Sequence, residues 1–235
     1  MWLFRAFLKV PLTKSDDNKR LVMSVNSDSV VGLFFEVTPQ PGHSEHYFSF
    51  VERLKPELAN YEGLVWLNRY RALFDGYSLL SHQLWDSEQS IENWRKNKTH
   101  RLAQTAGIKT HFKDYRIRIG KRLEGWLVDD KSELESCSPG GSSSLLLSVQ
   151  SKVPILDSIP EEYGSSKITY VDLVAQKQFI TLLEPNDLLH GKALGSGINA
   201  DIIDKIELFL IGRNYSMTER DQAPPQQPQK KINQY

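Results

Sequence analysis

Segments of strand-like and helix-like composition alternate in one order over residues 30–118, and this order most constrains the fold. Strands are expected where β-branched and aromatic residues cluster, and helices where apolar residues recur three or four positions apart. The expected elements are, in order, a strand at Val30–Val37, a helix at about Ser44–Asn60, strands at Leu64–Leu73 and Tyr77–Trp85, a helix at Glu88–Ala106 interrupted near Asn97, and a strand at His111–Arg118. The order β-α-β-β-α-β is the ferredoxin-like arrangement, so an α+β fold is predicted.

A weaker copy of this order is expected in the second half of the chain. Strands are predicted at Lys167–Val174, Gln178–Leu183 and Lys205–Ile211. The stretch Leu188–Ile198 contains three glycines, and glycine disfavours helix, so this copy is expected to have lost most of its second helix. The two halves are interpreted as a pseudo-dimer within one chain. The alternative is a plain C-terminal extension that covers one edge of the first sheet.

Composition divides the chain into five parts. The predicted parts are an N-terminal extension at 1–29, a first folded half at 30–126, a Ser- and Gly-rich linker at 127–145, a degenerate second half at 146–221, and a disordered, Pro- and Gln-rich tail at 222–235. Met23 reads like a natural start of translation, so Met1 and Met23 are both kept as candidate starts.

Charge and cysteine content exclude several classes of function. Lys and Arg number 29 and Asp and Glu number 29, so no net field attracts nucleic acid or an anionic membrane. No stretch reaches the roughly 18 apolar residues that a membrane span needs. Cys137 is the single cysteine, which excludes an intrachain disulfide and a multi-cysteine metal site. A reducing, cytoplasmic location is therefore expected.

A series of aromatic and polar residues in the first half resembles the antibiotic biosynthesis monooxygenase family. The series consists of Trp85, Trp94, His100, Gln104 and Gly107. Flanking stretches that add to the resemblance are Glu36–Gly42, Tyr47–Leu58 and Phe112–Arg116. The resemblance covers about residues 30–120, and the closing stretch Arg213–Pro224 resembles the end of two-copy members of that family.

This resemblance implies a fold and a kind of chemistry. The fold would be a dimeric α+β barrel in which two four-stranded sheets pack face to face, built between two chains as a homodimer or between the halves of one chain. A ligand pocket would lie between each sheet and its helices. Relatives oxygenate phenols and quinols without metal, flavin or haem, so a small aromatic substrate, molecular oxygen, no cofactor and no metal are expected. Other members of the family have different activities or none known, so the fold alone does not define the reaction.

The candidate site follows from the same series and from strand and helix geometry. His100, Trp85 and Ser81 are the expected catalytic residues. The expected substrate-binding residues are Trp94, Tyr77, Gln104 and Arg116. His100 and Gln104 are four residues apart and share a helix face. Because strand residues alternate, Ser81 and Trp85 should share one face of their strand and His82 should lie on the other.

Each of these assignments has a structural alternative. The two tryptophans could be core packing between helix and sheet, and His100 could cap or pack a helix. The arginines that alternate along strands could pair with carboxylates across the sheet or recognise an anionic quinone or carboxylate. They are Arg69, Arg71, Arg116 and Arg118.

The chain also departs from the family at positions that carry chemistry. Ser81 and Ile91 stand where quinol-oxidising relatives have Asn and Tyr, and isoleucine cannot donate a proton. Gln104 stands where haem-degrading relatives have a histidine ligand. A non-catalytic small-molecule-binding or stress-response module is therefore the alternative function. Haem binding through His82 or His100 is a third hypothesis.

Overall fold

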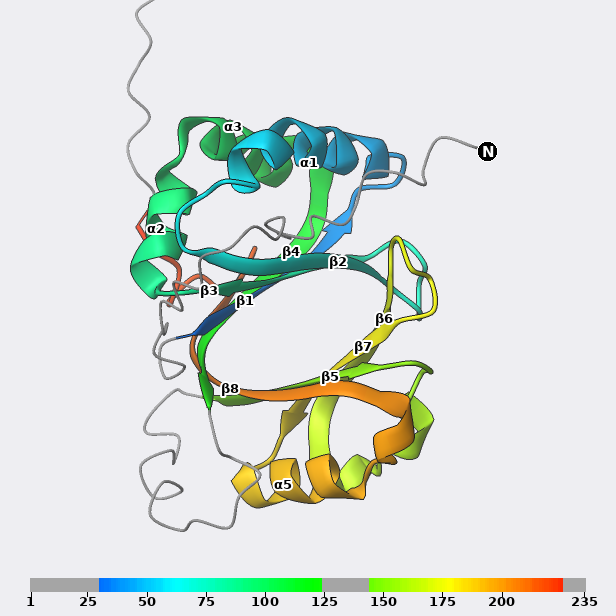
Figure 1. Cartoon of the computed structure of the whole chain (residues 1–235). Coiled ribbons are helices and arrows are strands. Elements are labelled where there is room, and N and C mark those ends of the chain that lie inside the picture. Colours follow the sequence, from blue (N-terminus) through cyan, green and yellow to red (C-terminus); the bar gives the residue numbers. More distant parts are fainter. Residues whose placement is uncertain (1–29, 124–143, 226–235) are drawn as a thin grey trace, which may run out of the picture.

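The computed structural model describes residues 30–123 and 144–225, in which eight strands close into one barrel with helices on two opposite outer sides (Figure 1). The predicted extension at 1–29 with both candidate starts, most of the predicted linker with Cys137, and the tail from 226 lie outside the described residues. No helix in the described part is long and apolar enough to cross a membrane.

The first half has the predicted ferredoxin-like order. Its elements are β1 (Val31–Pro39), α1 (Ser44–Leu58), β2 (Leu64–Ala72), β3 (Leu79–Trp85), α2 (Glu88–Lys96), α3 (Lys98–Ala106), the π-helical turn η2 (Gly107–His111) and β4 (Phe112–Leu123). The strands form an antiparallel sheet in the order β4-β1-β3-β2. The three helices cover its outer face (Figure 1).

The second half repeats the sheet with less helical cover. Its elements are β5 (Ser144–Ser151), β6 (Gly164–Asp172), β7 (Phe179–Pro185), α5 (Leu188–Gly197) and β8 (Ile203–Ser216). The order β8-β5-β7-β6 corresponds strand for strand to that of the first half. The strand β5 was not predicted, and it begins inside the stretch that composition assigned to a linker.

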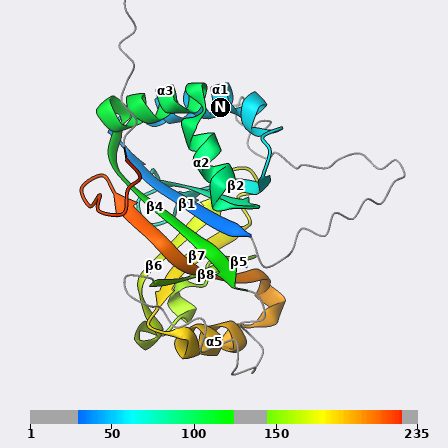
Figure 2. The same cartoon turned by 90° about the vertical axis from the view of Figure 1, so that its left-hand side faces the viewer.

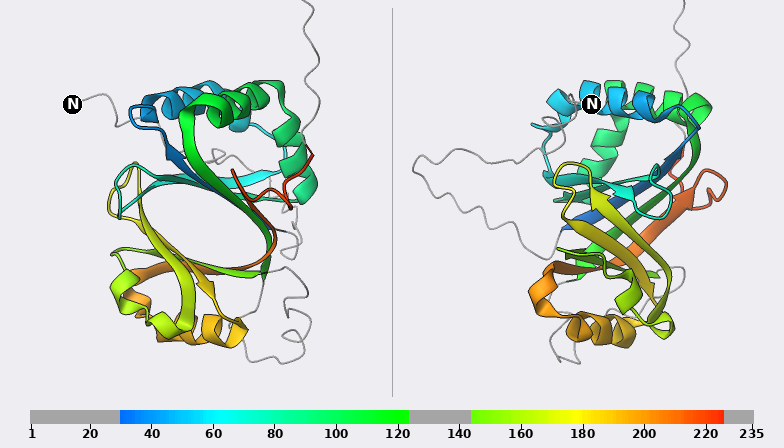
Figure 3. Two further views of the ribbon diagram at one scale, coloured as in Figure 1. Left: turned by 180° about the vertical axis from the view of Figure 1, so that it is seen from behind. Right: turned by 90° about the vertical axis from the view of Figure 1, so that its right-hand side faces the viewer.

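The barrel closes within one chain. Strand β2 pairs with β6, with Tyr70 opposite Asp172, and β4 pairs with β8 along most of its length (Figure 2). Seen from behind, the two sheets face each other, with α1–α3 over one and α5 over the other (Figure 3). The α+β barrel and the pseudo-dimer are thus confirmed, and the interpretation of the second half as an edge-covering extension is wrong.

The prediction that the second half lost most of its second helix is correct only in part. The helix α5 is present where the first half has α2, and the 3₁₀ turn η5 (Ala200–Ile202) stands where the first half has α3. The counterpart of α1 is missing, which was not predicted. Between β5 and β6 lie only two 3₁₀ turns, η3 (Leu156–Ser158) and η4 (Glu161–Tyr163). Asp187 caps α5 by accepting a hydrogen bond from the His190 backbone N–H at 2.8 Å. This cap and the burial of Leu194 offset the cost of the glycines, about 1 kcal/mol each.

The barrel interior combines an apolar core with a buried ionic cluster. Arg118 on β4 donates to Glu36 on β1 at 2.7 Å and to Glu184 on β7 at 2.9 Å. The Tyr170 hydroxyl on β6 donates to the second oxygen of Glu36 at 2.8 Å. Arg118 is 2% exposed. These bonds therefore join the two halves through charges withdrawn from water.

His82 also faces the barrel interior, as the alternation along β3 predicts. It is fully buried, and its ring stacks on Phe34 with centroids 4.3 Å apart. Neither ring nitrogen has a hydrogen-bond partner. Burial lowers the pKa of His82 to about 3, so the ring is neutral at physiological pH.

His82→Leu is expected to raise the free energy of unfolding by about 1–3 kcal/mol at pH 7.5, because it removes an unpaired buried polar group. The folded-state pKa of His82 is depressed, so the unfolded chain takes up a proton first as the pH falls below about 6.5. The wild type should therefore lose about 1.4 kcal/mol per pH unit through this group from about pH 6.5 down to its folded pKa.

Urea unfolding at pH 7.5 and pH 5 measures both effects. His46→Leu changes an exposed histidine and serves as the control. A stability for His82→Leu equal to that of the control at both pH values would contradict the prediction.

Candidate functional site

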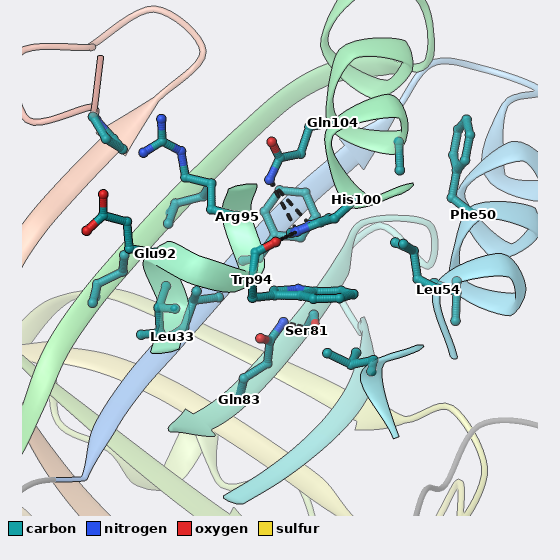
Figure 4. Close-up of a pocket in the computed structure, with 18 of the residues that line it drawn as sticks. Leu33, Phe50, Leu54, Ser81, Gln83, Glu92, Trp94, Arg95, His100 and Gln104 are labelled. Carbon is teal, nitrogen blue, oxygen red and sulfur yellow. Dashed lines mark hydrogen bonds between the residues drawn. The ribbon is translucent and has the colours of Figure 1, made fainter. Parts of the chain in front are cut away.

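A cavity of about 180 Å³ lies between the outer face of the first sheet and helices α1–α3 (Figure 4). Strand alternation supplies its floor, because every second residue of β1, β3 and β4 faces the helices. The floor residues are Leu33, Phe35, Ser81, Gln83, Ile117 and Ile119. Apolar side chains of the helices form most of the roof, including Val51, Leu54, Ile91, Trp94 and Ala103. Such a cavity suits a small, largely apolar molecule.

The break between α2 and α3 positions the histidine of this site. Asn97 ends α2 with an extended backbone, and its side chain accepts a hydrogen bond from the His100 backbone N–H at 2.9 Å. Asn97 therefore caps α3, whose first turn carries His100. The His100 ring stacks on Trp94 with centroids 4.6 Å apart and planes 21° apart (Figure 4).

A hydrogen bond determines which ring nitrogen of His100 carries the proton. Its Nδ1 lies 3.0 Å from the Trp94 carbonyl oxygen, and a carbonyl only accepts, so Nδ1 carries the proton and donates. The lone pair is thus on Nε2. Burial lowers the pKa of His100 to about 4, which keeps the ring neutral. The Gln104 amide nitrogen lies 3.4 Å from Nε2, at the long limit of a hydrogen bond.

A chain of hydrogen bonds runs along the helix-facing side of β3. The Trp85 indole N–H donates to the Gln83 amide oxygen at 3.0 Å, and the Gln83 amide nitrogen donates to the Ser81 hydroxyl oxygen at 3.1 Å. Since the Ser81 oxygen accepts in this chain, its own proton is available for another acceptor. Ser81 lines the cavity and can therefore donate to an oxygen of a bound molecule.

A second cavity, of about 620 Å³, adjoins the first and shares Phe35, Gln104 and Tyr215 with it. Five cationic residues and no carboxylate line it among the described residues. They are Arg95, Lys96, Arg101, Lys109 and Arg220. The second half contributes to both cavities through Tyr215 of β8 and through Pro224. The Pro225 carbonyl accepts from Arg95 at 2.8 Å, so residues 222–225 of the predicted disordered tail lie against the first half.

The structure brings together four of the seven residues that the sequence proposed. His100, Trp94, Ser81 and Gln104 line one cavity. His100 and Gln104 are adjacent, as their spacing on one helix predicts.

The other three residues do not line this cavity. Trp85 shares the face of Ser81 but is fully buried behind Gln83, where it packs against Tyr61. Tyr77 is 47% exposed in the β2–β3 turn. Arg116 lies on the opposite face of β4 from Ile117, and it pairs with Glu184 at 2.9 Å. Arg116 thus pairs with a carboxylate, as the structural alternative expected, but with one from the opposite sheet of the barrel and not from a neighbouring strand.

Residues that the sequence did not assign to the site also line the cavity. They include Tyr47, which was named only within a stretch that adds to the family resemblance, and Gln83, which had no assigned role. The alternation that placed Ser81 on the helix-facing side of β3 also places Gln83 there, so this residue could have been found. Tyr215 could not, because its position depends on the pairing of β4 with β8.

The described residues contain no group of three or more His, Cys, Asp and Glu side chains arranged to hold a metal ion. Three histidines are close together where the start of α1 meets the end of η2, but they do not form such a group. The Nδ1 atoms of His43 and His111 are 3.1 Å apart, and the His46 ring stacks on His111 with centroids 4.4 Å apart.

The fold and the site together define a single-chain α+β barrel with a cavity beneath the helices of its first half. Residues 31–106 match the family model described as antibiotic biosynthesis monooxygenase. The match contains Trp94, His100 and Gln104. It supports a monooxygenase-type function.

Comparison with characterised proteins finds a relative of similar length. The chain is 25% identical over 206 residues to the jasmonate monooxygenase ABM of Pyricularia oryzae, covering 82% of this chain and 95% of that protein. Among solved structures, an anthrone oxidase-like protein is 12% identical and covers 86% of this chain and 98% of its own, with a TM-score of 0.35. PA3566 from Pseudomonas aeruginosa is 17% identical and covers 40% of this chain and 95% of its own, with a TM-score of 0.37.

Proposed function

We propose that this protein is a cofactor-independent monooxygenase that oxidises a small, electron-rich aromatic molecule, a phenol or quinol, with molecular oxygen. The observation that carries the proposal is a neutral His100, whose unprotonated Nε2 can accept a proton, in the wall of a largely apolar cavity. The family match of residues 31–106 and the monooxygenase from Pyricularia oryzae support the reaction type.

In the proposed reaction His100 acts as the base. Nε2 removes a proton from the phenolic O–H, and the resulting electron-rich anion transfers an electron to O₂. Recombination forms a C–O bond, and the second oxygen atom leaves as water. For dihydroxynaphthalene the balance is one O₂ consumed for one hydroxynaphthoquinone and one water formed. The substrate supplies all the electrons, so no external reductant is needed.

The rest of the cavity has roles that suit this reaction. Trp94 forms part of the apolar wall and holds the His100 ring, which stacks on one of its faces. Ser81 and Gln104 can donate hydrogen bonds to a phenolate oxygen, which stabilises the charge that develops during proton removal. The apolar walls limit the access of water to the radical intermediates.

Oxygen uptake with dihydroxynaphthalene tests the proposal directly. The expected result is O₂ consumption in a 1:1 ratio to quinone, with no added metal, flavin or reductant. Jasmonate, for which the relative from Pyricularia oryzae is named, serves as a non-phenolic comparison that cannot supply the electrons for this reaction. No uptake above buffer with dihydroxynaphthalene by a folded sample, or equal uptake with jasmonate, would contradict the proposal.

The second candidate function is a non-catalytic small-molecule-binding module. Ile91 favours it, because this residue lines the cavity at the position where quinol-oxidising relatives are expected to have a proton-donating tyrosine. Binding of dihydroxynaphthalene, seen as quenching of tryptophan fluorescence, without any O₂ uptake would support this module over the enzyme.

A further inference from the structure

Arg69 is a buried cation in the wall of the apolar cavity. It lies on β2, is 8% exposed, and sits directly across the β2–β3 pair from Ser81. Alternation along β2 turns the neighbouring Asn68 and Tyr70 away, toward the barrel interior. Arg69 is thus held on the face of the sheet that the helices α1–α3 cover.

The surroundings of Arg69 do not neutralise its charge. Its Nε atom has no hydrogen-bond partner. No carboxylate of residues 30–123 or 144–225 forms an ion pair with it. Arg69 donates a hydrogen bond to the Tyr47 hydroxyl of α1. Burial raises the pKa of Tyr47, so this phenol is neutral and does not balance the charge of Arg69.

Arg118 is a buried arginine of the same barrel whose charge is balanced by carboxylates. It is 2% exposed and is paired with Glu36 and Glu184, both within 3 Å. An unpaired buried guanidinium is costly, because the desolvated charge is not repaid by a counter-charge. Arg69 therefore has the charge and the open hydrogen-bonding capacity of a binding residue whose anionic partner is a ligand.

We propose that Arg69, with the hydroxyl groups of Ser81 and Tyr47, binds a carboxylate carried by the small aromatic molecule that enters this cavity. A guanidinium matches the two oxygens of a carboxylate. The Ser81 proton is available for one of those oxygens. The inference rests on the site of the proposed function and specifies its ligand as an aromatic acid.

The neighbouring cavity supports the same class of ligand. Arg95 and Arg220 line it; Arg95 donates to the Pro225 carbonyl and Arg220 to the Tyr115 hydroxyl, both neutral acceptors. Their positive charges therefore persist at a cavity that shares Phe35 and Tyr215 with the site. Clustered cations raise the local concentration of anions.

The test compares the binding of naphthoate, its methyl ester and naphthol by titration calorimetry at pH 7.5. The wild type should bind naphthoate at least 10-fold more tightly than the ester, since a hydrogen-bonded charge favours binding by roughly 10- to 100-fold. Arg69→Gln should remove this preference while leaving ester affinity within about 3-fold. Arg71→Gln is the matched control, because Arg71 is on the same strand but exposed, and it should keep the preference.

Equal binding of the acid and the ester by the wild type would overturn the inference, as would an equal loss in Arg71→Gln. Preference for naphthol over naphthoate would also overturn it, because Arg69, Ser81 and Tyr47 would then recognise a phenol and not a carboxylate. If Arg69→Gln fails to fold, Arg69→Lys is used, which keeps the charge and should retain part of the preference. Binding is measured without turnover, so a preference for the acid without O₂ uptake would reject the proposed reaction alone.

Discussion

Replacing His100 by Phe is expected to lower turnover of dihydroxynaphthalene by about 10²- to 10⁴-fold, the usual contribution of a general base. Phenylalanine keeps the aromatic stack on Trp94 but lacks the Nε2 lone pair. The substrate should still bind, so the loss should fall on kcat rather than on KM. Initial rates of quinone formation measure this difference.

The pH profile gives an independent check on the role of His100. Nε2 is a base only when it is unprotonated, and the pKa of His100 is lowered to about 4. The rate should therefore stay level as the pH falls from 8 to 5, and decline only near pH 4. His46→Phe, at an exposed histidine outside the cavity, should keep both rate and profile. A profile that declines near pH 6.5, in samples that remain folded, would argue against His100 as the base.

Arg118→Met is expected to lower the free energy of unfolding by about 3 kcal/mol, because it removes the cation that Glu36 and Glu184 share. Glu184 keeps its ion pair with Arg116, and Glu36 keeps its hydrogen bond from Tyr170, so neither carboxylate is left wholly unpaired. Glu36 and Glu184 would lose hydrogen bonds of 2.7 and 2.9 Å. These bonds link strands of the two halves, so the variant should also lose cooperativity between them. Urea unfolding followed by circular dichroism measures both effects.

An exposed ion pair provides the comparison for this prediction. Arg213 contacts Glu88 at 2.6 Å, and both side chains are more than 40% exposed. Arg213→Met should cost at most about 1 kcal/mol, because solvent screens such pairs. Equal losses in the Arg118 and Arg213 variants would show that burial of the first pair has no energetic consequence.

Local patterns predicted much of the fold and part of the site. The order of elements between residues 30 and 118 depends on neighbours in sequence, and the structure confirms it. The same holds for the placement of Ser81 and His82 on opposite faces of β3 and for the contact of His100 with Gln104.

The failures share a cause, which is that periodicity separates two faces without saying what covers each face. Alternation in β4 separates Arg116 from Ile117, but only the assembled barrel shows that Ile117 faces the helices. Trp85 lies on the predicted, helix-facing side of β3, but it does not reach the cavity because Gln83 and Tyr61 pack around it. In the second half, the Asp187 cap outweighed the glycines that had argued against α5.

Joining the halves in one chain frees this barrel from the symmetry that a homodimer imposes. In a homodimer every substitution occurs twice, so both pockets change together. Here the corresponding strands β4 and β8 place Ile117 opposite Tyr215, an aliphatic side chain beside a phenol. Mutation of Tyr215 alters the walls of the two adjoining cavities of the first half, and selection can reshape them without changing the same residue in a second copy.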